Sequence, residues 1–448
     1  MDGSLAESHA RFVPETLTSS TKDRGERIGV VGLGYVGLPV SVALAEAYET
    51  VIGFDTNPER ISALRSARDW THEISVDQLS HSDLKLTSTV DDLAVCSIIV
   101  VAVPTPITDD HRPDFGPLIS ACRSVGPVMR KGTVVVFEST VHPGATEDIC
   151  GPELEVASGL KSGVDFHLAY SPERISPGDK QRGFKAATKI VAAQSLFARE
   201  RVATVYEKVV EAGVFRAPSI KVAEAAKVFE NTQRDVNIAL MNELSEVCEG
   251  LGIRTADVIE ATATKWNALP FTPGLVGGHC IGVDPHYLVT CAKTHGVHPD
   301  IMMAARRRNE AVADRIVSSA LKALINADLR VRGARVGLLG VTFKENVPDT
   351  RNSKSFDIIT GLRKLGIDPL VGDPLASAPE CAARRVQIVP LEAMTGLDLL
   401  ILAVPHRNYL LGKGKFLQTL LRSGGTLMDV RSALDPGEIR DDLHYWSL

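Results

Sequence analysis

Residues 27–37 read Arg-Ile-Gly-Val-Val-Gly-Leu-Gly-Tyr-Val-Gly, an apolar strand that runs into a Gly-x-Gly-x-x-Gly turn. The next apolar strand ends at Asp55, about 20 positions further on. In such a unit the pyrophosphate of a dinucleotide lies on the helix N-terminus, while the acid accepts hydrogen bonds from the adenosine ribose and repels a 2′-phosphate. The stretch therefore predicts a Rossmann-like domain that binds NAD through Gly32, Gly34, Gly37 and Asp55. A glycine-rich turn of a flavodoxin-like protein would leave the acid unexplained.

The apolar strands of this region recur near the C-terminus. The matching pairs are 27–32 with 335–340, the strand before Asp55 with the strand before Asp373, and 98–104 with 399–405. The second copy lacks the glycine pattern but carries Lys344, Arg351 and Arg431 near its expected strand ends, where such sheets bind ligands. We therefore expect a second Rossmann-like domain that binds an anionic nucleotide. The alternative is that these cations are solvated surface residues.

A long helix is expected between the two copies. Residues 220–250 contain no proline, have apolar residues at helical spacing, and are followed by glycine at 252. Such a helix would form a spine between the sheets and a homo-oligomer interface. Lys227 and Asn231, four residues apart, share one face of it and either line a cleft or belong to a solvated stripe.

These patterns predict an α/β protein with two Rossmann-like doubly wound parallel-sheet domains joined by a central helical domain. The expected segments are a flexible N-terminal tail at 1–25, an NAD-binding domain at 26–215, a central helical domain at 216–330 and a nucleotide-binding domain at 331–448.

The composition limits the possible partners and location. The net charge of −6 argues against nucleic acid or an anionic membrane as the main partner, and the first residues lack an apolar segment of signal-peptide or membrane-spanning length. Seven cysteines, with no Cys-x-x-Cys pair, indicate reduced thiols in a cytoplasmic protein.

One cysteine stands in an unusual setting. Residues 277–285 read Gly-Gly-His-Cys-Ile-Gly-Val-Asp-Pro, so Cys280 lies between glycines that leave its sulfur open. A thiolate is a nucleophile in acyl chemistry, and Asp284 could activate water beside it. His279 either lowers the pKa of this thiol or simply packs. The spacing of the histidines and acids fits no regular metal site, so no metal is expected.

Together, these residues resemble the UDP-glucose/GDP-mannose dehydrogenase family over roughly residues 26–440. The motifs that carry the resemblance are Gly-Leu-Gly-Tyr-Val-Gly at 32–37, Glu-Ser-Thr at 138–140, Tyr-Ser-Pro-Glu-Arg at 170–174, Lys227 with Asn231, Gly-Gly-His-Cys at 277–280, Phe-Lys at 343–344 and Asp-Thr-Arg at 349–351. The loop from 265 to 284 is similar to that of UDP-N-acetylglucosamine or UDP-N-acetylgalactosamine 6-dehydrogenases, whereas UDP-glucose dehydrogenases have Gly-Gly-Ser-Cys.

The resemblance implies a four-electron oxidation, by two NAD⁺, of the 6-hydroxyl of a UDP-N-acetylhexosamine to the uronic acid, for polysaccharide biosynthesis. Cys280 would form a thiohemiacetal and then a thioester. Lys227 and Asn231 would stabilise an oxyanion, Asp284 and Thr140 would act on water, and Glu173 would assist proton transfer, unless Glu173 only orders the loop beside Arg174.

The resemblance also implies two sets of contacts. Cofactor contacts fall on Gly32, Gly34, Tyr35, Val36, Gly37, Asp55, Arg60, Pro104, Thr105, Ser139, Thr140 and Arg351. Substrate contacts fall on Glu173, Arg174, Lys227, Asn231, Phe271, Pro273, Gly274, Gly277, Lys344 and Arg431.

Other functions remain open. UDP-N-acetylmannosamine or UDP-glucose is the alternative substrate within the same chemistry. A two-electron hydroxyacid dehydrogenase would keep the NAD turn but would not need Cys280 or a second sheet, and a non-catalytic NAD-binding module would need neither Cys280 nor the Lys227–Asn231 pair.

Overall fold

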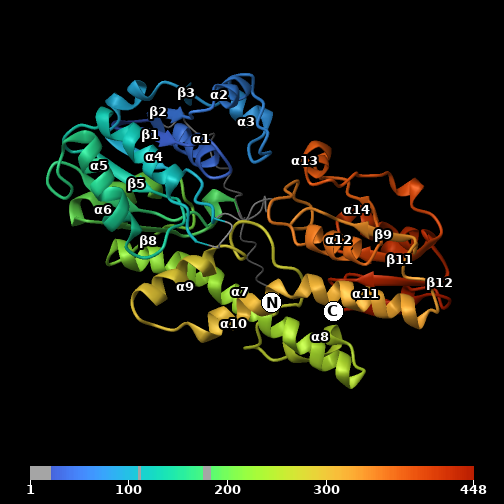
Figure 1. Cartoon of the computed structure of the whole chain (residues 1–448). Helices are drawn as coiled ribbons and strands as arrows, with labels where there is room; N and C mark the ends of the chain where they lie inside the picture. The colour runs from blue at the N-terminus through green and yellow to red at the C-terminus, as the bar shows by residue number, and fades with distance from the viewer. Residues whose placement is uncertain (1–21, 109–111, 175–182) are drawn as a thin grey trace, which may run out of the picture.

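The computed structural model describes residues 22–108, 112–174 and 183–448, so most of the expected tail lies outside the described residues. Two sheets stand apart, with α7, α9 and α10 beneath the first and α11 beneath the second (Figure 1). The first strand already begins at Asp23, within the stretch assigned to the tail from sequence. The architecture confirms the predicted α/β class with two sheets and a helical centre.

The N-terminal sheet contains eight strands of the described chain in the order β3-β2-β1-β4-β5-β6-β7-β8. They are β1 (Asp23–Val31), β2 (Tyr48–Phe54), β3 (Lys85–Thr87), β4 (Ile98–Val101), β5 (Val134–Phe137), β6 (His167–Tyr170), β7 (Lys189–Ala193) and β8 (Val214–Arg216). The sheet is parallel, as predicted for a doubly wound domain, except that β6 and β7 are antiparallel. Parallel neighbours need a long crossover, usually helical, whereas the described residues between β6 and β7 hold a single 3₁₀ turn at 184–186.

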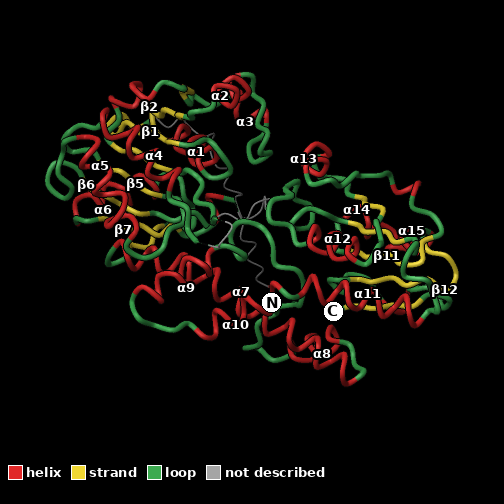
Figure 2. Tube along the Cα trace, in the orientation of Figure 1, coloured by secondary structure: helices red, strands yellow, loops and turns green. Residues whose placement is uncertain are grey.

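The C-terminal sheet contains five strands of the described chain, all parallel, in the order β10-β9-β11-β12-β13. They are β9 (Val336–Leu339), β10 (Leu370–Gly372), β11 (Leu397–Leu402), β12 (Leu421–Asp429) and β13 (His444–Ser447). This order reproduces β2-β1-β4-β5-β6 of the first sheet strand by strand. The two sheets, drawn in yellow in Figure 2, therefore confirm the internal repeat predicted from sequence.

Helices cover both faces of the sheets and build the centre. They are α1 (Gly37–Ala47), α2 (Pro58–Arg65), α3 (Val76–Ser80), α4 (Gly116–Val125), α5 (Gly151–Ser158), α6 (Leu196–Glu207), α7 (Ile220–Leu251), α8 (Thr255–Ala263), α9 (Asp284–Thr294), α10 (Asp300–Glu310), α11 (Val312–Asn326), α12 (Ser355–Lys364), α13 (Ala378–Ala383), α14 (Arg407–Leu410) and α15 (Lys415–Thr419). Within the described residues, no helix has the length and apolar character needed to cross a bilayer.

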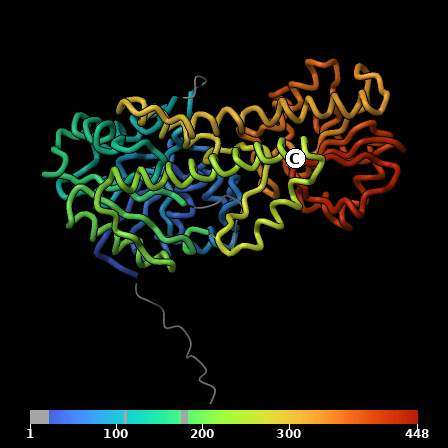
Figure 3. Tube along the Cα trace, turned by 90° about the horizontal axis from the view of Figure 1, so that it is seen from below, coloured from blue at the N-terminus to red at the C-terminus, as the bar shows by residue number. Residues whose placement is uncertain are grey.

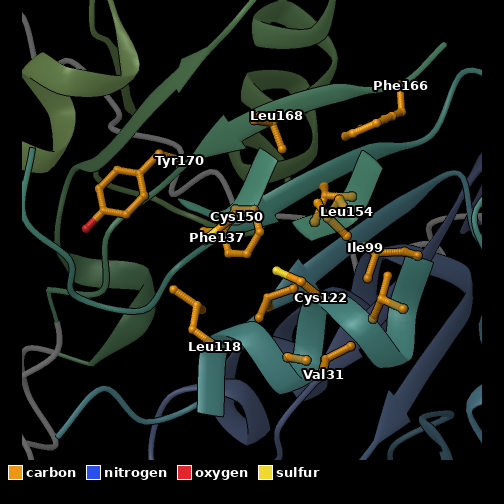
Figure 4. Close-up of a cluster of buried hydrophobic side chains, with 14 of the residues drawn as sticks. Val31, Ile99, Leu118, Cys122, Phe137, Cys150, Leu154, Phe166, Leu168 and Tyr170 are labelled. Carbon is orange, nitrogen blue, oxygen red and sulfur yellow. The ribbon is translucent and has the colours of Figure 1, made fainter. Parts of the chain in front are cut away.

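The valine-rich strands of the first sheet are buried on both faces. On one face, Leu118 and Cys122 of α4 and Leu154 of α5 pack against strand residues such as Ile99 and Phe137 (Figure 4). On the other face, α1 and α6 pack against Ile28, Val100 and their neighbours. Burial on both faces requires continuous apolar strands rather than alternating ones, which is the pattern that the sequence shows.

The helix α7 is the spine predicted from sequence. Its 32 residues give a length of about 48 Å. The Ser219 side chain accepts a hydrogen bond from the Val222 amide at its start, and Gly252 ends it in a left-handed conformation with φ of 70°. Figure 3 shows it running from the N-terminal part of the molecule to the border of the C-terminal part, so one helix connects the two.

Candidate active site

The glycine turn between β1 and α1 is shaped for close approach. Gly32 has φ of +90°, and a Cβ there would lie 2.9 Å from the Ala102 carbonyl. A Cβ on Gly37 would lie 1.8 Å from the Gly32 carbonyl, so only glycine allows α1 to begin this close to the strand. A Cβ on Gly34 would meet nothing within 4 Å, so this part of the turn is open. With Val36 at the N-cap of α1, the turn fits a dinucleotide pyrophosphate.

Two further predicted cofactor residues brace this turn. Asp55, at the end of β2, accepts hydrogen bonds from the Leu33 amide (2.9 Å) and the Asn57 amide (2.9 Å). Arg60 is buried, donates from Nε to the Leu33 carbonyl (2.8 Å) and pairs with Asp69 (2.8 Å). The acid and the arginine therefore hold Leu33 from both sides in addition to any contact with a ribose.

The loops that follow β4 and β5 are joined above the sheet. Thr105 donates to the Thr140 carbonyl (2.7 Å), and Ser139 donates to the Val103 carbonyl (2.6 Å). Tyr287 of α9 donates to the Thr105 carbonyl (2.8 Å), which links the central helices to the same edge. Exposed Pro104 lies in this junction.

The thiol loop meets the spine helix at a buried cluster of charged and polar groups. Cys280 is half-buried, and its carbonyl accepts from the amide of Asp284, the first residue of α9 (2.9 Å). The Asp284 carboxylate accepts from the amide of Asn231 (2.5 Å) and lies 3.7 Å from the ammonium of Lys227. The structure thus brings together four predicted catalytic residues, and Lys227 and Asn231 face a buried acid rather than solvent.

The electrostatics of this cluster favour a neutral thiol and a cationic lysine. Burial raises the pKa of Cys280, and the Lys227 charge opposes this shift. Burial likewise raises the pKa of Asp284, against Lys227 and the Asn231 hydrogen bond. For Lys227 burial acts against the charged form, but Asp284 and Cys280 prevail and raise its pKa. Lys227 is therefore cationic, and its charge favours the thiolate of Cys280.

His279 does not supply positive charge to the thiol. Burial, together with the Arg351 charge, lowers the pKa of His279 to about 4, so the ring is neutral at pH 7. The cations that favour the thiolate of Cys280 are Lys227 and Arg234. Of the two roles considered from sequence for His279, an effect of its charge on the thiol pKa is therefore not supported, since His279 is not among the groups that shift the pKa of Cys280. The ring nitrogen instead lies 3.8 Å from Asp349 of the C-terminal domain.

Glu173 lies beside a buried ion pair that sequence reasoning missed. Its carboxylate is 3.8 Å from the ammonium of Lys189, which also lies 2.9 Å from fully buried Glu138. Tyr206 donates to Glu138, and the charge of Glu173 acts on both Cys280 and Lys227. Lys189 opens a short strand and carries no local signal of burial, so only the packing of β5, β6 and β7 shows that it faces Glu173.

The predicted substrate residue Arg174 is engaged within the protein. Its guanidinium pairs with Glu230 of α7 (3.1 Å) and donates to the Thr188 carbonyl (3.0 Å). It therefore fixes the segment after β6 to the spine helix.

The C-terminal sheet reaches the site through loops at its carboxyl edge. Arg431 follows β12 and donates to the Pro273 carbonyl (3.3 Å), while Lys344 lies in the long loop after β9. The same loop approaches Gly277 and Gly278, because a Cβ on either would lie 2.7 Å from Asn352 or Phe343 atoms. Half-buried Phe271 begins this stretch.

Arg351 joins all three parts of the molecule. Its guanidinium lies 4.8 Å from the ring centroid of Tyr35 in the glycine turn and forms a bidentate pair with Asp349. Asp349 in turn faces His279. Arg351, a predicted cofactor residue, therefore reaches from the loop after β9 to the glycine turn of the first sheet.

Comparison with known proteins identifies the family. Models of the UDP-glucose/GDP-mannose dehydrogenase family match the chain in its NAD binding domain (26–210), its central domain (221–311) and its UDP binding domain (337–436).

Within the described residues, no group of three His, Cys, Asp or Glu side chains could hold a metal ion.

Individual relatives align over nearly their whole length. The chain is 46% identical to Protein CapL of Staphylococcus aureus over 94% of this chain and 99% of that one. It is 45% identical to UDP-N-acetyl-D-glucosamine 6-dehydrogenase of Pseudomonas aeruginosa over 93% and 99%. Among solved structures, UDP-D-ManNAc dehydrogenase from Pyrococcus horikoshii superposes with a TM-score of 0.85 at 30% identity, covering 94% and 98%. The chain therefore belongs to the UDP-glucose/GDP-mannose dehydrogenase family and is an NAD-dependent UDP-sugar dehydrogenase.

Proposed function

We propose that this enzyme oxidises the 6-hydroxyl of a UDP-N-acetylhexosamine, UDP-N-acetylglucosamine or its galacto epimer, to the carboxylate through a covalent intermediate on Cys280. The observation that carries the proposal is the buried cluster in which Lys227 and Asn231 contact the carboxylate of Asp284, whose backbone amide donates to the carbonyl of half-buried Cys280. The substrate class is supported by the relatives named UDP-N-acetyl-D-glucosamine 6-dehydrogenase, from Pseudomonas aeruginosa and from Salmonella typhi (42% identical).

In the first oxidation the 6-hydroxyl becomes an aldehyde. NAD⁺ held at the glycine turn between β1 and α1 would serve as the hydride acceptor, so each of the two oxidations would remove a hydride and a proton. The ammonium of Lys227 and the amide of Asn231 lie four residues apart on one face of α7, so both can face the sugar oxygen as negative charge develops on it. A preorganised cation and an amide donor in a buried site stabilise such charge strongly.

The sulfur of Cys280 then bonds to the aldehyde carbon, and its proton passes to the carbonyl oxygen, which gives a thiohemiacetal. Loss of the second hydride and of the hydroxyl proton converts this adduct to a thioester. The tether holds the carbon in place between the two oxidations. Burial raises the pKa of Cys280 and so favours its neutral form, while the charge of Lys227 favours the thiolate that attacks.

Hydrolysis completes the reaction. Water adds to the thioester carbonyl, the carbon–sulfur bond breaks, and the thiol regains a proton. Asp284 and Thr140 position this water, and Glu173 accepts its proton. The carboxylate product is a sugar-nucleotide building block that we assign to polysaccharide biosynthesis, as the family resemblance implies.

Stoichiometry and variants of Cys280 test the mechanism. Wild-type enzyme should form two NADH per UDP-sugar, Cys280→Ala should abolish this turnover, and Cys280→Ser should accumulate a sugar adduct that intact-protein mass reveals. The matched control is Cys291→Ala. Cys291 is also half-buried but lies on α9, so this variant should have normal turnover. One NADH per sugar, or normal turnover by Cys280→Ala, would favour the two-electron alternative.

Direct competition tests the substrate. Purified enzyme should prefer an N-acetylated sugar nucleotide, with the acid product identified by mass. Turnover of UDP-glucose at least equal to that of UDP-N-acetylglucosamine and UDP-N-acetylgalactosamine would contradict the proposal, and preference for UDP-N-acetylmannosamine would move it to the alternative epimer.

We also propose that α7 mediates homo-oligomerisation. Phe229, Leu240, Val247 and Leu251 form an exposed apolar stripe on α7, with Leu240 58% exposed. A stripe of this kind on a central helix suits contact with a second copy. Leu240→Glu should reduce the oligomer measured by sedimentation, whereas Val156→Glu, at an exposed site on α5, should not.

A further inference from the structure

A row of buried polar side chains continues along α7 beyond the two proposed to touch substrate. Lys227, Asn231, Asp235 and Asn242 are separated by four, four and seven residues, so they share one face of the helix. The first two face Asp284 on the thiol loop. The other two serve no step of the proposed chemistry, although burying them costs free energy unless each is fully bonded.

The side chain of Asn242 makes hydrogen bonds to both the amide and the carbonyl of Gly274. It is 1% exposed, its Oδ1 accepts from the Gly274 amide (2.8 Å), and its Nδ2 donates to the Gly274 carbonyl (3.1 Å). The same Nδ2 donates to Oδ1 of Asn309 on α10 (2.8 Å). The side-chain amide of Asn309 cannot be flipped, because its Nδ2 donates to the Asp235 carboxylate (2.7 Å), which can only accept. The Asn242 amide is therefore fixed in one orientation.

The backbone of the residue that Asn242 holds favours glycine, and a side chain there would displace Arg431. Gly274 has φ of +152°, and a Cβ on it would lie 2.3 Å from Nη1 of Arg431. Arg431 also donates to the carbonyl of Pro273. The chain at 273–274 is therefore held between α7 on one side and the C-terminal sheet on the other, six positions before Cys280.

We propose that Asn242 is a positioning residue for the reaction: it fixes the segment 271–277, and through it Cys280, in register with Lys227 and Asn231 on the same helix. This role rests on the proposed function, in which the sulfur and the two α7 groups act on one carbon. A helix is rigid, whereas 271–277 has no regular secondary structure of its own. Misplacing reacting groups by about 1 Å can cost about 100-fold in rate, which makes a clamp on this segment consequential.

The variant Asn242→Asp tests this role with almost no change of shape. In this variant one carboxylate oxygen still accepts from the Gly274 amide. The other faces the Gly274 carbonyl and Asn309 Oδ1, and neither of these oxygens can donate a hydrogen bond to it. We expect kcat for the UDP-sugar to fall about 100-fold while the Kd of NAD⁺ stays within about twofold. Iodoacetamide should alkylate Cys280 faster relative to Cys291 of the same sample. The control Asn326→Asp makes the same change at an exposed helix end and should match wild type in every measurement.

Asn242→Ala adds no charge and replaces the aspartate variant in these measurements if that variant does not fold.

Hydrogen exchange of wild-type enzyme needs no variant: the Gly274 amide should be protected although it lies in a loop, and exchange without protection would overturn the proposal. Folded Asn242 variants with the kcat and the alkylation ratio of Asn326→Asp would also overturn it, as would a changed alkylation ratio with unchanged kcat. Failure of the proposed function is distinguishable, because normal turnover by Cys280→Ala refutes the thiol chemistry while exchange and alkylation still report on the clamp.

Discussion

The two sheets share a strand order, yet their first turns are built in opposite ways. Five residues, 32–36, separate β1 from α1, whereas fifteen, 340–354, separate β9 from α12. The short turn leaves a helix N-terminus open for a pyrophosphate. The long one folds over the sheet edge and contacts the thiol loop at Gly277 and Gly278. One repeat therefore keeps the glycine turn, while the other uses the same position for a loop that contacts the candidate active site.

The acids at the ends of β2 and β10 show the same divergence. Asp55 is partly exposed and makes two backbone hydrogen bonds. Asp373 is buried, accepts from four backbone amides and lies 3.1 Å from Nε2 of His406. The His406 ring also accepts from the Asn346 amide in the long loop (2.9 Å). The second acid has become a structural group that fixes this loop.

The largest effect is expected from Gly37→Ala. The new Cβ would overlap the Gly32 carbonyl, at 1.8 Å, so the turn must open and the amide cradle is lost. We expect NAD⁺ affinity to fall about 100-fold and UDP affinity to stay within about twofold, because the second sheet does not share this turn. Isothermal titration with each ligand measures both. A matching loss of UDP affinity would show that the two sheets are not independent.

Asp373→Asn should act on stability instead. Its hydrogen bonds, His406 in particular, hold the pKa of Asp373 below its ordinary value despite burial. Its contribution to stability is therefore present above the ordinary aspartate pKa and is lost as pH falls through the lowered value. We expect the variant to lose about 2–3 kcal/mol of unfolding free energy at pH 7. Denaturant titration at pH 7 checks this, and unchanged stability would contradict the structural role.

Asp55→Asn should change cofactor choice with little effect on folding. Removing the carboxylate charge removes repulsion of a 2′-phosphate, so the preference for NAD⁺ over NADP⁺ should narrow about tenfold. The ratio of kcat/KM for the two cofactors measures the effect. Equal use of both by wild-type enzyme would refute the assignment of Asp55.

The smallest effect is expected from His279→Asn. Because the pKa of His279 is about 4 and that of Cys280 is raised, alkylation of the thiol should keep rising with pH above the ordinary thiol value and should not follow histidine ionisation. The variant should have the same pH profile of Cys280 alkylation as wild type. A profile with a midpoint near pH 6.5 that the variant removes would restore His279 as a tuning residue.

The sequence by itself determined the elements that depend on local pattern. The glycine turn, the repeated apolar strands and the α7 helix follow from spacing, because backbone freedom, burial on two faces and helical periodicity are written into neighbouring residues. The motifs also placed Cys280, Lys227 and Asn231 among the candidates, since these carry recognisable chemistry.

Tertiary structure alone decided how distant groups meet. Glu138 faces Lys189, Asn242 holds Gly274, and Arg351 reaches Tyr35 across more than 300 positions of sequence, each from a different element. The antiparallel β7 likewise depends on how the chain returns to the sheet edge. The charge on a buried group is set by neighbours in space rather than in sequence, so the pKa of His279, which burial and the Arg351 charge lower, follows only from the packing around it.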